Sequence, residues 1–80
     1  MKKINISVIG LGYVGLPLAL SFGKYFNTTG YDINKKRIDE LKKNKDINSE
    51  AKKIDFTKSK KINFSNNIKD IINSNIYIIT

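Results

Sequence analysis

One short stretch decides the fold of this chain, Ile9-Gly10-Leu11-Gly12-Tyr13-Val14-Gly15, which joins two segments of different hydrophobic period. Before it, residues 3–9 are rich in isoleucine and valine and end abruptly at a glycine, which predicts a buried strand. After it, apolar side chains recur at helical spacing over residues 14–26, which predicts a helix. The stretch follows the pattern G-x-G-x-x-G, so we expect a glycine-rich turn from strand into helix.

The alternation of strand and helix continues along the chain. Strands are predicted over residues 3–9, 28–32, 62–64 and 76–79, and helices over residues 14–26 and 34–43. Asn34 is the expected N-cap of the second helix. Residues 44–61 are polar and lysine-rich, and we expect a loop there with one irregular helical turn near residues 50–54. A brief helix capped by Ser65 or Asn66 is expected to follow the third strand.

This order of elements predicts the fold class. Strands that alternate with helices form parallel sheets with right-handed crossovers. We therefore predict an α/β fold, a Rossmann-type doubly wound parallel sheet that is represented by its first four strands in the spatial order 3-2-1-4. The cofactor crevice of such a sheet opens where the order reverses, between strands 1 and 4.

Each glycine of the turn has a physical role in holding a dinucleotide. Gly10 permits a tight turn, Gly12 lets a pyrophosphate approach the backbone, and Gly15 lets the helix pack closely on the sheet. The N–H groups and the dipole of the helix N-terminus favour the negative charge of the phosphates. We therefore expect the turn to bind NAD through residues Gly10, Leu11, Gly12, Tyr13, Val14 and Gly15. The alternative is an ordinary glycine turn with no ligand.

Asp32 strengthens the dinucleotide hypothesis, because it ends the second strand 20 positions after Gly12. An acidic residue at this distance accepts hydrogen bonds from the ribose hydroxyls and disfavours the 2′-phosphate of NADP. The alternative for Asp32 is a turn or cap residue. Lys35, Lys36 and Arg37 follow closely and offer a counter-charge to a 2′-phosphate. Arg37 has two alternative roles. It either stacks on the adenine or reaches the phosphate and ribose, or it is an exposed residue of the first helical turn.

Composition limits the chemistry that the chain itself can perform. Its 80 residues suffice for one small domain. Cysteine and histidine are absent, which excludes disulfides, thiolate and imidazole metal sites, and cysteine nucleophiles within the chain. We therefore expect no catalytic and no metal-ligating residue here.

The charge and the hydropathy indicate which partners to expect. The formal net charge is +8, and 14 of the 15 basic residues are lysine. Base-reading surfaces favour arginine, so we expect a solvated lysine-rich surface and no nucleic-acid partner. No apolar run approaches the roughly 20 residues that span a bilayer, and the N-terminus lacks the features of a signal peptide. We expect a cytoplasmic protein without a membrane partner.

The motifs resemble a known family. Residues 9–19, with their run Gly-Tyr-Val-Gly-Leu-Pro-Leu-Ala, closely resemble the N-terminus of the UDP-glucose/GDP-mannose dehydrogenase family. Residues 30–38 resemble its second strand and following helix, and residues 63–80 its third and fourth strands. The Leu-Pro-Leu-Ala version is most similar to the branch that oxidises UDP-N-acetylhexosamines for surface polysaccharides.

The resemblance implies oxidation of a nucleotide sugar at C6, from alcohol to carboxylate, with two NAD, in an enzyme that is a homo-oligomer. It assigns the pyrophosphate to the turn at residues 10–15, the ribose to Asp32 and a basic partner to Arg37. It also assigns Thr80, at the end of the fourth strand, to the cofactor crevice. The chain departs from the family in one respect, because the family uses a cysteine nucleophile and this sequence has none.

The missing cysteine, together with the parts that the family carries after its fourth strand, defines what we expect of the chain as a whole. The family's catalytic lysine, dimerising helix and nucleotide-binding C-terminal domain all follow the fourth strand. We therefore interpret the chain as the N-terminal part of an NAD-binding domain, a fragment for which the UDP-sugar is a partner only in the full-length enzyme. The rival interpretation is a non-catalytic NAD-sensing module. Such modules share the glycine turn and the acidic residue but lack the Tyr-Val-Gly-Leu-Pro-Leu run.

The first prediction concerns activity. The 80-residue chain should form no NADH from NAD and a UDP-sugar, because it has no cysteine to carry the thioester chemistry that the resemblance implies. The measurement is NADH absorbance after rigorous purification. Sustained NADH production that follows the protein through every purification step would contradict the fragment interpretation.

Overall fold

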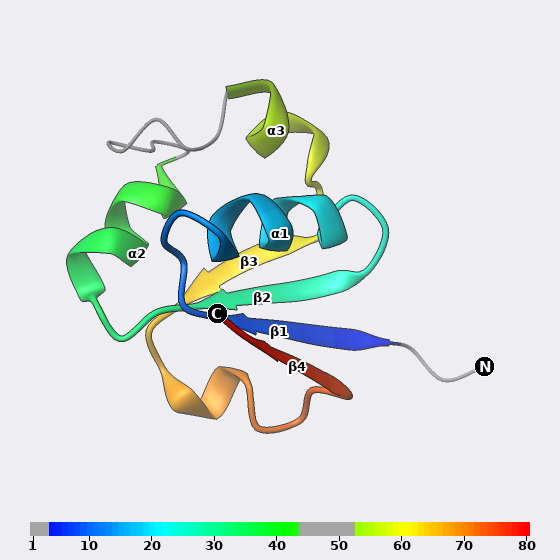
Figure 1. Ribbon diagram of the computed structural model, residues 1–80, viewed down its shortest axis with the longest axis vertical. Helices are drawn as coiled ribbons and strands as arrows, with labels where there is room; N and C mark the ends of the chain where they lie inside the picture. The colour runs from blue at the N-terminus through cyan, green and yellow to red at the C-terminus, as the bar shows by residue number, and fades with distance from the viewer. Residues whose placement is uncertain (1–3, 44–52) are drawn as a thin grey trace.

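The computed structural model describes residues 4–43 and 53–80, and its centre is a four-stranded parallel sheet (Figure 1). The strands are β1 (Asn5–Ile9), β2 (Asn27–Tyr31), β3 (Ile62–Ser65) and β4 (Ile76–Ile79). Their order in space is β3-β2-β1-β4, and every neighbouring pair is parallel. This confirms the predicted α/β class and the predicted order 3-2-1-4.

The connections lie on both faces of the sheet. One face carries α1 (Gly15–Phe22), α2 (Lys35–Lys42) and α3 (Lys53–Lys58), and the connection from β3 to β4 covers the other with the short 3-10 helix η1 (Ile68–Asp70). On that second face the hydroxyls of Ser7 and Ser74 share a hydrogen bond, and the hydroxyl of Tyr77 donates to the carbonyl oxygen of Ile71. The arrangement is the doubly wound one that the alternation predicts.

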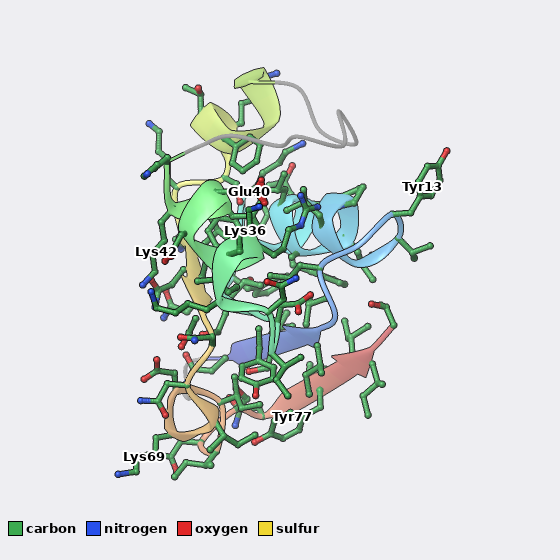
Figure 2. All side chains as sticks on the ribbon, turned by 90° about the vertical axis from the view of Figure 1, so that its left-hand side faces the viewer. Tyr13, Lys36, Glu40, Lys42, Lys69 and Tyr77 are labelled. Atoms are coloured by element: carbon green, nitrogen blue, oxygen red, sulfur yellow. The ribbon has the colours of Figure 1, made fainter. Side chains whose placement is uncertain are left out.

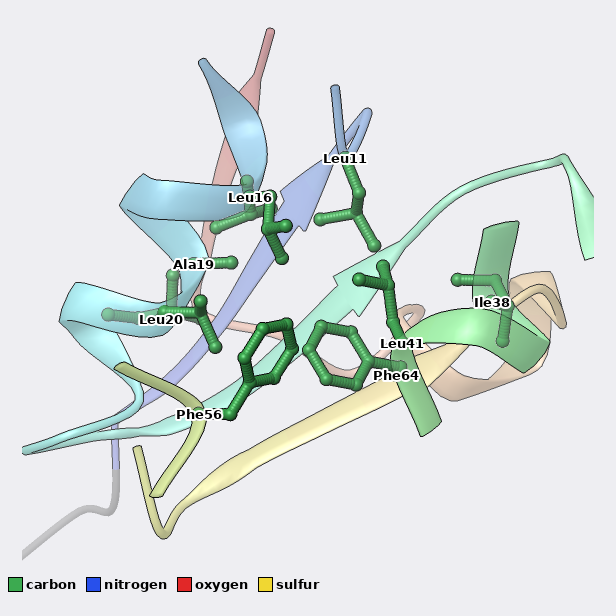
Figure 3. Close-up of a cluster of buried hydrophobic side chains, with 10 residues drawn as sticks. Leu11, Leu16, Ala19, Leu20, Ile38, Leu41, Phe56 and Phe64 are labelled. Atoms are coloured by element: carbon green, nitrogen blue, oxygen red, sulfur yellow. The ribbon is translucent and has the colours of Figure 1, made fainter. Parts of the chain in front are cut away.

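The hydrophobic core lies between the sheet and its three α-helices (Figure 3). It consists of Ile6, Val8, Leu11, Leu16, Ala19, Leu20, Ile38, Leu41, Phe56 and Phe64. Alternation along β1 places Ile6 and Val8 in this core and turns Ser7 to the other face. Leu11 belongs to the core although it lies in the glycine-rich turn, so packing against the helices holds that turn in place.

The first helix is shorter than predicted. It ends at Phe22, with Gly23 as its C-cap, and β2 begins at Asn27, so the prediction of a helix over residues 14–26 is wrong at its C-terminal end. The cause is tertiary. The carbonyl oxygen of Gly23 accepts a hydrogen bond from the backbone N–H of Lys61 at 2.9 Å, and a side chain at residue 23 would overlap the hydroxyl of Ser59.

Two other local predictions need correction. The helical turn expected near residues 50–54 corresponds to α3, and residues 50–52 lie outside the described part of the chain. This helix matters because it places the ring of Phe56 against Phe64, with ring centroids 6.3 Å apart. The cap of η1 is Asn67 and not Ser65 or Asn66, since the Asn67 side chain accepts from the N–H of Lys69 at 3.0 Å. The predicted cap of α2 is confirmed, because Asn34 Oδ1 accepts from the N–H of Arg37 at 3.2 Å.

The start of α1 is packed against the ends of two strands. A side chain on Gly15 would overlap the carbonyl oxygen of Gly10 and would lie 2.6 Å from Oγ1 of Thr80. The absence of a Cβ at residue 15 therefore lets α1 begin directly over the carboxyl ends of β1 and β4. This confirms the close helix–sheet packing expected at the third glycine.

Replacement of Gly15 tests this packing. We expect Gly15→Ala to lower the free energy of unfolding by about 2 kcal/mol or more, because over-packing forces the backbone apart. Chemical denaturation followed by circular dichroism measures the change. Gly12→Ala is the matched control, since a Cβ there would meet no atom within 4 Å and should leave stability nearly unchanged. Equal stability of the two variants would refute the close approach.

Candidate dinucleotide-binding site

A groove of about 290 Å³ opens at the carboxyl ends of the central strands. Eight of the nine residues that the sequence nominates line it: Gly10, Leu11, Gly12, Tyr13, Val14, Gly15, Asp32 and Thr80. They come from the β1–α1 turn and from the ends of β2 and β4, which are sequence-distant segments that the sheet order brings together (Figure 1). The ninth residue, Arg37, is not among the residues that line this groove.

A larger hollow of about 360 Å³ lies elsewhere and includes Asn5 and Asn27, which begin β1 and β2. Open parallel sheets bind their ligands outside the carboxyl ends of the strands, where the chain turns into the helices. The larger hollow is at the opposite end of these strands. The smaller groove over the glycine-rich turn is therefore the candidate site.

The backbone of the glycine-rich turn is tightly turned at Gly10 and open at Gly12. Gly10 adopts φ of +95°, a left-handed conformation that a side chain disfavours, and a Cβ there would lie 2.9 Å from the carbonyl oxygen of Thr80. At Gly12 the space around a Cβ position is open to at least 4 Å. Gly10 therefore makes the turn possible, and Gly12 leaves its backbone accessible from the groove.

The N-terminus of α1 presents backbone donors beside this open space. In the described residues no side chain caps α1, and its first turn contains no acidic residue. The N–H of Leu16 donates to the carbonyl oxygen of Gly12 at 3.2 Å, which marks the first helical bond after the turn. The preceding N–H groups of a helix have no intrahelical acceptor, and the helix dipole makes this end attractive to anions. A diphosphate supplies both the acceptors and the negative charge.

Asp32 is held in a fixed orientation by the backbone. Its Oδ2 accepts from the N–H of Leu11 and its Oδ1 accepts from the N–H of Asn34, both at 2.9 Å. The N–H of Asp32 itself donates to the carbonyl oxygen of Ser65 at 3.2 Å, which continues the pairing of β2 with β3. An ionised carboxylate has about four lone-pair sites, so Asp32 retains acceptors for ribose hydroxyls. The turn-or-cap role is also present, since Asp32 binds the turn that follows it.

Arg37 contacts the glycine-rich turn from α2. It is in the first turn of α2, is 8% exposed, and its Nε donates to the carbonyl oxygen of Leu11 at 2.9 Å. The alternative of an exposed helix residue is therefore wrong. The periodicity of α2 gave no sign of this, because burial of an arginine follows from a tertiary acceptor, here a carbonyl in a turn 26 residues away.

The remaining groove residues offer mainly backbone. The side chains of Tyr13 and Val14 are 82% and 65% exposed, and Figure 2 shows Tyr13 projecting away from the body of the molecule. The side chain of Leu11 is fully buried. Thr80 donates its hydroxyl to the carbonyl oxygen of Gly10 at 2.7 Å and its N–H to that of Ile9 at 3.0 Å, which fastens the end of β4 to the turn.

Residues 4–43 and 53–80 also bear on two other kinds of site. No cluster of three or more acidic side chains there has the arrangement of a metal site. None of the helices in residues 4–43 and 53–80 has the length and apolar character required to cross a bilayer.

Comparison with known proteins adds independent information. Residues 4–80 match the model of the UDP-glucose/GDP-mannose dehydrogenase family, NAD binding domain. The whole chain is 46% identical to a UDP-N-acetyl-D-glucosamine 6-dehydrogenase of Salmonella typhi and 40% identical to a protein of the same name from Pseudomonas aeruginosa. It spans 19% of the length of each of these relatives. The solved structure of a UDP-D-ManNAc dehydrogenase from Pyrococcus horikoshii matches with a TM-score of 0.78 and 28% identity, over 96% of this chain and 20% of that one.

The sheet order and the glycine-rich turn at its reversal point make this chain a Rossmann-type dinucleotide-binding domain. The family match extends across all four strands. The chain therefore belongs to the UDP-glucose/GDP-mannose dehydrogenase family. Its residues 4–80 correspond to the NAD-binding domain of that family. Membership favours the dehydrogenase interpretation over the non-catalytic sensing module.

The contacts of Asp32 lead to a stability prediction. Asp32→Ala should lower the free energy of unfolding by about 2 kcal/mol, because it removes two hydrogen bonds to an ionised acceptor. The amide of Leu11 should also exchange with solvent faster. Asp39→Ala is the matched control, since Asp39 forms an exposed ion pair with Lys35 at 3.3 Å along α2, and such pairs contribute about 0.5 kcal/mol. If the two variants had the same free energy of unfolding and the same exchange rate of the Leu11 amide, the contacts of Asp32 would be contradicted.

Proposed function

We propose that the groove holds NAD with its pyrophosphate over residues 10–15 and its adenosine ribose on Asp32. The observation that carries this is the pairing of an open backbone at Gly12 with a carboxylate fixed by two N–H groups. Backbone donors at the N-terminus of α1 bind the diphosphate, and the remaining lone pairs of Asp32 accept from the ribose hydroxyls. The side chains of Tyr13 and Val14 are not required, because the turn binds through its main chain.

The order of the strands sets the direction in which NAD lies. Asp32 follows β2, the glycine-rich turn follows β1, and Thr80 follows β4, and these strands are neighbours in that order. A dinucleotide with its adenosine on Asp32 and its phosphates over Gly12 therefore extends toward Thr80. The nicotinamide half lies on the β4 side of the sheet, where the reaction with a substrate takes place.

For the whole enzyme we propose a nucleotide-sugar 6-dehydrogenase that oxidises a UDP-N-acetylhexosamine or UDP-glucose to the uronate with two NAD, for surface polysaccharide synthesis. The names of the Salmonella typhi and Pseudomonas aeruginosa relatives support this choice of substrate class. We assign it to the cytoplasm, where NAD and nucleotide sugars are available, and expect the enzyme to be a homo-oligomer. In this proposal the chain supplies the cofactor site. Other parts of the enzyme supply the residues that bind the UDP-sugar and the catalytic residues.

The test is a calorimetric titration of the 80-residue chain with NAD and with NADP. We expect NAD to bind more tightly, because the carboxylate of Asp32 repels a 2′-phosphate. Gly12→Ala should bind NAD at least tenfold more weakly at unchanged stability, since its methyl group occupies the open space at the turn. Asp32→Ala should weaken NAD and reduce the preference over NADP.

Three results would contradict the proposed geometry. The first is no measurable binding of NAD to the folded chain, and the second is equal binding by the Gly12→Ala variant. The third is an Asp32→Ala variant that binds both cofactors as the original chain does. Asp39→Ala serves again as the control, because it removes one negative charge from the exposed side of α2, outside the groove.

A further inference from the structure

We infer that the outer edge of β4 is a self-association surface, at which the β4 strands of two copies of the 80-residue chain pair in antiparallel orientation about a two-fold axis. The inference goes beyond the proposed function and does not depend on NAD. In a longer chain, a fifth strand of the doubly wound sheet would occupy the same edge. The inference therefore concerns the 80-residue chain.

The strand β4 has one side without a partner strand. It is the last strand in the order β3-β2-β1-β4, and in residues 4–43 and 53–80 no strand lies beyond it (Figure 1). Ile9 is in register with Ile79, and its carbonyl oxygen accepts from the N–H of Thr80 at 3.0 Å. In a parallel pair a residue bonds to the neighbours of its register partner, so the N–H and C=O of Ile79 point to the outer side. An edge of this kind is a template for another extended backbone.

The side chains of β4 are those of a strand inside a sheet. Ile76 and Ile78 lie on the face that carries α1, and Tyr77 and Ile79 lie on the opposite face. Strands that are apolar on both faces are typical of positions within a parallel sheet. Yet Ile76, Tyr77 and Ile79 are exposed. A strand paired along the outer side of β4 would shield these side chains through cross-strand contacts.

The two outer strands of the sheet differ in how they are protected. Lys58, Lys60 and Lys61 come just before β3, and lysines at an edge oppose pairing with another chain. Residues 71–80, which include β4, contain no charged residue, no proline and no glycine. A short apolar segment of this composition is prone to form intermolecular strand pairs. Of the two edges, the edge of β4 is therefore the one that accepts a second strand.

The distribution of charge favours a second copy as the occupant. In residues 62–80 the charges of Lys69 and Asp70 cancel, so the net charge of +8 comes from residues 1–61. An acidic partner would be drawn to those residues, for example to the basic side chains of α2, and not to β4. The edge instead matches an uncharged apolar strand, and β4 of another copy is such a strand. A two-fold axis lets each β4 pair with the other and closes the assembly at two chains.

The experiment measures the mass of the chain by sedimentation equilibrium at concentrations up to about 1 mM. Ile79→Pro removes the outward N–H and adds no charge, and Ile79→Lys places a charge on the edge. Ile79 is chosen over Tyr77 because the hydroxyl of Tyr77 donates to the carbonyl oxygen of Ile71. Ile33→Lys is the matched control for Ile79→Lys, because Ile33 lies between β2 and α2 and is 85% exposed, compared with 79% for Ile79. Circular dichroism shows whether each variant is folded.

We expect the original chain and Ile33→Lys to dimerise with the same Kd, and both Ile79 variants to raise the Kd for dimerisation at least tenfold. Dimerisation of the original chain should strengthen between about 0.05 M and 0.5 M salt, because salt screens the repulsion between two copies that each carry +8. The amides of Tyr77 and Ile79 should exchange with solvent more slowly as the protein concentration rises, because they become donors to the second copy.

Several results would overturn the inference. A monomer at every concentration would mean that the edge of β4 is reserved for a different strand. Unchanged dimerisation of Ile79→Pro, equal weakening by Ile33→Lys and Ile79→Lys, or growth beyond two chains would each exclude the paired edges. Exchange of the Tyr77 and Ile79 amides that does not depend on concentration would do so in the original chain, whether or not the variants fold. None of these results bears on the NAD site, which the calorimetric titration tests separately.

Discussion

The structure depends on one close approach, that of Gly15 to the carbonyl oxygen of Gly10. With no Cβ between them, α1 starts directly where β1 ends. The same approach admits the hydroxyl of Thr80, which donates to the Gly10 carbonyl oxygen and holds the end of β4 at the turn. The N-terminus of α1 and the carboxyl ends of the central strands thus meet at one place. The groove exists because a helix and two strands share this corner.

Much of this corner of the structure can be predicted from the sequence, because it depends on local patterns. Alternating strand and helix signals gave the fold class, and the spacing of Gly10, Gly12 and Gly15 marked the turn. Hydrophobic periodicity alone predicts an α1 that is too long, because the carbonyl oxygen of Gly23 accepts from the N–H of Lys61 and does not continue the helix. Such contacts join residues that are far apart in the sequence, and hydrophobic periodicity carries no information about them.

The candidate site shows the same division between what is local and what is tertiary. The position of Asp32 at the end of β2 followed from the strand pattern and from its distance to the glycines. Its bond to the N–H of Leu11 did not, and neither did the burial of Arg37. Both Asp32 and Arg37 are bound to the backbone of Leu11, and the sequence gives no signal for contacts to this residue. A leucine between two glycines is an unremarkable loop residue in sequence, whereas in the fold it anchors the turn in the core.

The placement of the basic residues after Asp32 bears on the choice between NAD and NADP. Three basic residues follow Asp32 as possible partners for a 2′-phosphate. Arg37 donates from its Nε to the carbonyl oxygen of Leu11, and Lys35 pairs with Asp39 along the exposed side of α2. Lys36 is exposed and is not among the residues that line the groove. Asp32 remains in the groove, with its carboxylate oriented by two N–H groups. A 2′-phosphate carries the same sign of charge as this carboxylate, and their repulsion lowers the binding free energy of NADP where solvent is partly excluded. In the proposed geometry the side chain beside the ribose is therefore an anion, which favours NAD over NADP although the net charge of the chain is +8.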